Sequence, residues 1–133
     1  MVFESAHVST TIDRPMSDVY EFASDPRNLT AWATGLAEGT VEHIDGAWAI
    51  DSPMGRVTVT FAPPNPFGVL DHDVTLPFGD IVHNPMRVSA NADGCDVVFT
   101  VHRRDGVGEA DFVADTETVA RDLAALRALL ERR

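Results

Sequence analysis

The carboxyl-terminal stretch 112–133 carries apolar residues at intervals of three and four, which constrains the fold of this chain more than any other feature. The apolar positions are Phe112, Val119, Leu123, Leu126 and Leu130, with Ala120 and Ala124 beside them. This spacing predicts a long amphipathic helix with one buried stripe. Because such a helix depends on tertiary packing for most of its stability, the rest of the chain must supply a surface that covers the stripe.

Most of the chain before this helix has the alternating pattern of β-strands separated by short turns. We expect strands over residues 2–13, 40–44, 47–51, 56–62, 69–76, 81–90 and 96–103. Between the first two, Pro15 and Pro26 each suit the start of a short helix. Strands grouped apart from helices indicate an α+β fold. We therefore predict a curved antiparallel sheet of seven strands wrapped around the long carboxyl-terminal helix, with two short helices after the first strand and a cavity between helix and sheet.

Composition excludes several classes of protein. The formal net charge is -11 and the chain has no lysine, so it repels phosphate backbones and a nucleic acid partner is not expected. No segment is long and apolar enough to span a bilayer, and membrane insertion is not expected. The single cysteine, Cys95, permits no intrachain disulfide and favours a cytoplasmic location. With no break in composition, we expect residues 1–133 to form one domain.

Several local stretches resemble one family. They are Thr11-Ile12-Asp13-Arg14-Pro15 leading into Val19-Tyr20-Glu21-Phe22, then Asp25-Pro26 and Trp32, the stretch Val98-Phe99-Thr100, and the closing pattern from Val119 to Leu130. Together with the order of elements, they are similar to the START-like (SRPBCC) superfamily, which includes polyketide cyclase/dehydrase-type proteins. The resemblance implies a helix-grip fold with a deep cavity for a hydrophobic small molecule. It implies no catalytic residue, because no single catalytic motif runs through these proteins.

His72 is the most informative polar residue. In an extended strand it shares a face with Leu70, Val74 and Leu76, whereas Asp71 lies on the other face. If the apolar face is the concave one, His72 projects into the cavity, where it would orient a polar group of the ligand or act as a general base. The alternative is a core histidine that only hydrogen-bonds to the backbone.

The remaining ligand-binding candidates are large apolar residues on predicted inward faces. With His72, they are Trp32, Trp48, Phe61, Met86 and Phe99. Buried aromatic residues pack in the core more often than they line a ligand, so each also has a simple core interpretation.

We expect neither a metal nor a cofactor. Asp71 and Asp73 share a strand face, but two carboxylates are too few for a hard cation, and the five histidines have no zinc-site spacing. Gly106-Val107-Gly108 lacks the third glycine of a dinucleotide fingerprint.

The leading hypothesis is a protein that binds a hydrophobic or aromatic small molecule in the cavity. Within this hypothesis, an enzyme of the cyclase or dehydratase type would use His72 for acid–base chemistry. The alternative is a protein-interaction module of the co-chaperone kind, or a structural module that forms homodimers, without a small-molecule ligand.

Overall fold

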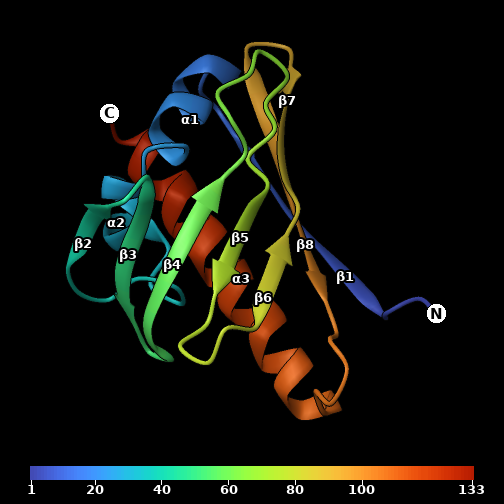
Figure 1. Ribbon diagram of the computed structural model, residues 1–133. Coiled ribbons are helices and arrows are strands. Elements are labelled where there is room, and N and C mark those ends of the chain that lie inside the picture. Colours follow the sequence, from blue (N-terminus) through green and yellow to red (C-terminus); the bar gives the residue numbers. More distant parts are fainter.

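The computed structural model describes residues 1–133 and has the predicted α+β architecture, with strands wrapped around a long terminal helix (Figure 1). The eight strands are β1 (Ser5–Ile12), β2 (Val41–Ile44), β3 (Ala47–Ser52), β4 (Gly55–Phe61), β5 (His72–Thr75), β6 (Ile81–Asn84), β7 (Met86–Asn91) and β8 (Gly94–His102). The helices are α1 (Met16–Ala23), the 3₁₀ turn η1 (Pro26–Asn28), α2 (Leu29–Trp32) and α3 (Glu109–Glu131). None of them combines the length and the apolar character needed to cross a bilayer.

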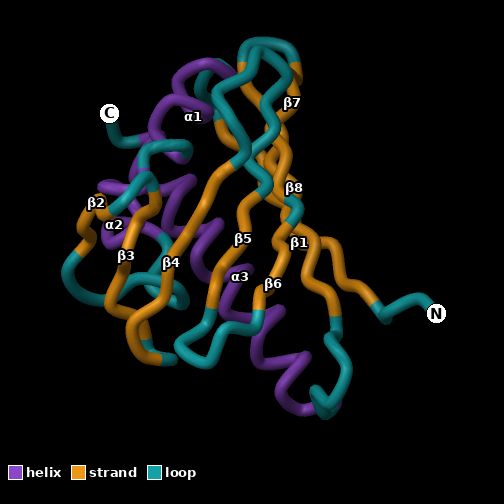
Figure 2. The backbone as a smooth tube through the Cα atoms, in the orientation of Figure 1, coloured by secondary structure: helices purple, strands orange, loops and turns teal.

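The strands form two antiparallel sheets, ordered β1-β8-β7 and β2-β3-β4-β5-β6, rather than one sheet of seven. The expected strand 81–90 is divided at Pro85, which has no backbone N–H to continue a ladder. Its first part pairs with β5 and its second part with β8. Beyond the bond from the Thr100 N–H to the Pro85 carbonyl, β6 and the end of β8 are not paired. The sheet therefore opens between these two strands, as the diverging backbone tubes of Figure 2 show.

Helix α3 lies behind the five-stranded sheet in Figure 1, and the strands it approaches most closely are β1 and β8 of the other sheet. Phe112, Leu123, Leu126 and Leu130 are buried in the main apolar core, as the spacing predicts. Ala120 and Ala124, which we placed beside the stripe, are exposed instead. The buried stripe is therefore narrower than predicted.

The two short helices lie at one end of α3. Asp25 caps η1 by accepting a hydrogen bond from the Arg27 N–H at 3.0 Å, and Pro26 occupies the first position of the turn, as expected. Pro15 precedes α1 as its cap residue rather than lying inside its first turn. Arg14 donates to the Leu130 carbonyl at 2.7 Å, which ties the start of α1 to the end of α3.

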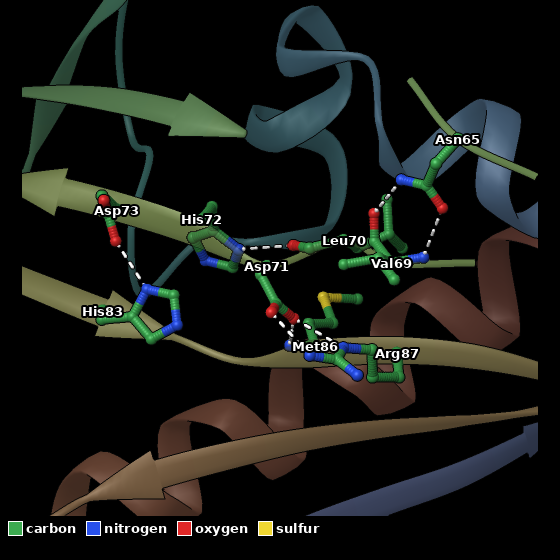
Figure 3. Close-up of polar contacts among 9 residues, drawn as sticks. All are labelled: Asn65, Val69, Leu70, Asp71, His72, Asp73, His83, Met86 and Arg87. Carbon is green, nitrogen blue, oxygen red and sulfur yellow. Dashed lines mark hydrogen bonds and ion pairs between the residues drawn. The ribbon is translucent and has the colours of Figure 1, made fainter. Parts of the chain in front are cut away.

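The proline-rich loop between β4 and β5 is held by one asparagine. The Asn65 side chain donates to the Val69 carbonyl and accepts from the Val69 N–H, both at 3.0 Å (Figure 3). Because these bonds close the loop locally, the following residues enter β5 in a fixed register. This register turns His72 and Val74 toward α3 and Asp73 toward solvent.

Candidate functional site

A cavity of about 190 Å³ lies between α3 and the concave face of the five-stranded sheet. The sheet wall comes from β4, β5, β6 and the end of β8, the helix wall from residues 115–123 of α3, and one end is closed by α2. The opening between β6 and the end of β8 borders the cavity, because Asn84 and Val101 both line it. Most of the lining is apolar, which is typical of sites for small organic molecules.

His72 projects into this cavity from β5 and is only 5% exposed. Its Nδ1 lies 3.0 Å from the Leu70 carbonyl oxygen, which can only accept a hydrogen bond, so Nδ1 carries the proton (Figure 3). Nε2 is consequently an acceptor, and its one protein partner is the Asn84 amide nitrogen at a long 3.4 Å. Burial lowers the pKa of His72 below its ordinary value, which keeps the ring neutral at pH 7.

Two aromatic rings hold His72 in place. The Phe61 ring centroid lies 5.1 Å from that of His72 in a tilted arrangement. The Phe99 ring lies 5.7 Å away and meets the imidazole edge-on. Both phenylalanines also line the cavity, so the polar Nε2 is presented from an aromatic wall.

The structure brings together four of the six candidate ligand-binding residues: Trp32, Phe61, His72 and Phe99. Trp48 has the expected strand parity but lies near α1, where it borders a separate groove with Tyr20 and stacks on His43. Met86 is buried in the core on β7 and does not line the cavity. The alternation along a strand predicts which side chains point inward, but it does not indicate which part of the interior remains empty.

Trp32 closes the cavity at α2 and has an unusual feature. Its indole Nε1 is buried and has no hydrogen-bond partner in the protein. A buried donor without a partner costs roughly 1–3 kcal/mol, so such atoms call for an explanation. The nitrogen itself has no accessible surface, so a molecule in the cavity would contact the ring of Trp32 and not its N–H.

Asp122 is a cavity residue that the sequence analysis missed. It lies on α3 next to Leu123, with its Oδ1 accepting from the Thr34 hydroxyl at 3.3 Å and its Oδ2 from the Gly35 N–H at 3.2 Å. Gly35 makes this approach feasible, because a Cβ there would lie 2.2 Å from the Thr118 Cγ2. The signal was available, since Asp122 is three residues after Val119 and four before Leu126, at the edge of the buried stripe.

Asp71, just before β5, and Asp73, within it, bind neighbouring strands and do not line the cavity. Asp71 accepts two hydrogen bonds from the Arg87 guanidinium and one from the Met86 N–H, and the arginine holds the pKa of this carboxyl below its usual range (Figure 3). Asp73 pairs with His83 across the strands at 2.6 Å. Both aspartates therefore have partners from within the protein.

Cys95 is buried beside the β7–β8 turn, and burial, together with the charge of Asp96, raises the pKa of its thiol. A raised pKa suppresses the thiolate, so this cysteine has the character of a core residue.

Comparison with known proteins agrees with this geometry. The sequence profile of a family described as "Polyketide cyclase / dehydrase and lipid transport" matches residues 4–131. No curated protein matches the chain.

Solved structures with this fold share little sequence with the chain. DynU16, from the dynemicin biosynthetic locus, has a TM-score of 0.73 at 14% identity over 96% of this chain and 47% of its own. An uncharacterised protein from Bacillus thuringiensis has a TM-score of 0.74 at 11% identity over 95% of this chain and 98% of its own. CalU16 from Micromonospora echinospora has a TM-score of 0.66 at 14% identity over 98% and 84%. At these identities the similarity establishes the fold alone.

Proposed function

Since the chain belongs to the polyketide cyclase/dehydrase and lipid transport family, we propose that it binds a small aromatic or alicyclic molecule in the cavity between α3 and the sheet. The single observation that carries this proposal is a buried polar nitrogen, His72 Nε2, that faces an apolar cavity with only a 3.4 Å contact to the protein. A buried acceptor of this kind is best satisfied by a ligand hydroxyl or amide donor.

The volume of the cavity limits the ligand to a small molecule. An apolar cavity of about 150 Å³ in a protein core binds benzene. The cavity here has about 190 Å³, so it suits a compound of one or two rings and excludes a long-chain lipid without substantial opening of the walls. The aromatic side chains of Phe61, Phe99 and Trp32 would contact the faces and edges of such a ring.

His72 is better suited to bind than to take a proton. A general base gains a charge when it acts, and burial disfavours the imidazolium form of this side chain. The group that orients its Nδ1 is the neutral Leu70 carbonyl rather than a carboxylate, which would have stabilised the charge. We therefore favour ligand binding over cyclase or dehydratase chemistry at this residue.

The test compares two probes that differ by one hydroxyl, 4-ethylphenol and ethylbenzene, in calorimetric titrations. We expect the phenol to bind the wild-type protein about tenfold more tightly, because only it donates to His72 Nε2. His72→Leu should remove this preference while ethylbenzene still binds. His43→Leu, at an exposed site on β2 outside the cavity, is the control and should keep the preference. Failure of both probes to bind would refute the proposal.

A further inference from the structure

The carboxylate of Asp122 is the one acidic group of the cavity that lies among its buried apolar residues. It is partly buried between Val119 and Leu123, and burial raises the pKa of its carboxyl. Its two hydrogen-bond donors, the Thr34 hydroxyl and the Gly35 N–H, are both neutral, at 3.3 and 3.2 Å. Asp122 forms no ion pair with any residue of the chain. A carboxylate removed from water without a cation is costly, and groups of this kind concentrate at functional sites.

No arginine forms an ion pair with Asp122. Arg104 lines the cavity, but its charge acts on Asp115, which lies two turns before Asp122 and therefore about 10 Å away along α3. Arg121 is exposed and donates to the Thr118 hydroxyl. Its charge favours the ionised form of Asp122, but burial outweighs this effect and the pKa of Asp122 is still raised. With no lysine in the chain, no other cation of the protein lines this cavity.

Two further features of the protein favour a cation near this carboxylate. The aromatic rings of Trp32, Phe61 and Phe99 line the same cavity, and the negative faces of aromatic rings attract cations. The net charge of -11 raises the local concentration of cationic molecules around the protein.

From this arrangement we propose that the cavity selects a small arylalkylamine, whose protonated amine pairs with Asp122 on α3 while its ring contacts the aromatic wall. This proposal rests on the proposed function, because it assigns the class of ligand for the same cavity. The amine supplies the charge that the helix wall lacks, and His72 on the sheet wall accepts any hydroxyl donor on the ring.

Three probes of similar size test the selection: 2-phenylethylamine, 2-phenylethanol and 3-phenylpropanoate, each titrated calorimetrically at pH 7. We expect the amine to bind the wild-type protein at least about tenfold more tightly than the alcohol, because a charge-assisted hydrogen bond to Asp122 forms only with the amine. The anionic probe should bind most weakly. Asp122→Asn should bring the amine and the alcohol to equal affinity, whereas Asp122→Glu should retain most of the preference.

The control is Glu117→Gln, which removes one negative charge from an exposed position of α3 outside the cavity. It should leave the preference for the amine unchanged, so that a general charge effect is separated from pairing at Asp122. Equal affinity of wild-type protein for the amine and the alcohol would overturn the inference and leave the proposed function intact. Absence of binding by all three probes would overturn both. Even if Asp122→Asn does not fold, the comparison of the amine with the alcohol on the wild-type protein still tests the inference.

Discussion

Replacement of Leu126 by alanine is expected to lower the free energy of unfolding by about 3 kcal/mol. Leu126 is fully buried on α3 and belongs to the apolar core that joins this helix to the strands. The substitution removes buried methyl groups and leaves a void in the core between the helix and the strands. Urea unfolding followed by circular dichroism measures the change.

Leu129→Ala is the matched control, since it deletes the same atoms three residues further along the same helix. Leu129 is only half-buried, so its replacement should cost less than half as much. Equal losses for the two variants would show that α3 does not face the sheet through the predicted stripe, and the location of the cavity would then be wrong.

Val101→Trp is expected to weaken binding of 4-ethylphenol by at least about 100-fold, equivalent to roughly 2.7 kcal/mol. Val101 lies on β8, is buried, and lines the cavity next to its opening toward β6. An indole at this position would occupy space that the ligand needs. Because the ring enters an existing void instead of a packed region, the melting temperature should stay within a few degrees of wild type.

The control for this variant is Val113→Trp, which introduces the same side chain on α3 at a residue that is 44% exposed. It should leave the affinity for 4-ethylphenol unchanged. Retained binding in Val101→Trp, measured by the same titration, would mean that the probe binds elsewhere on the protein.

The architecture could be predicted from the sequence because the spacing of apolar residues indicates which face of each helix or strand is buried. The three- and four-residue spacing of Leu123, Leu126 and Leu130 predicted the face that α3 buries, and this prediction is confirmed. The alternation around His72 correctly predicted that it turns inward with Val74. Both results depend on local geometry, which a pattern of side chains encodes directly.

The predictions that were wrong, and the cavity residue that was missed, depend on contacts between segments that are far apart in the sequence. Pro85 divides one expected strand in two, and the opening of the sheet depends on β8 continuing with β1 rather than with β6. Asp122 reaches the cavity because Gly35, far away in the sequence, allows the segment after α2 to lie against α3. Met86 meets a filled part of the interior and Trp48 borders a separate groove, and neither outcome can be predicted from the alternation along a single strand.

The most direct test of a ligand site between α3 and the sheet is to determine where a bound molecule lies. In a methyl-labelled sample with 4-ethylphenol, we expect intermolecular nuclear Overhauser effects from the aromatic protons of the probe to the methyl groups of Val74, Val101 and Leu123, which come from both walls of the cavity. Contacts confined to exposed methyl groups such as those of Ile44 and Ile81, with none to the three cavity residues, would contradict a ligand site between α3 and the sheet.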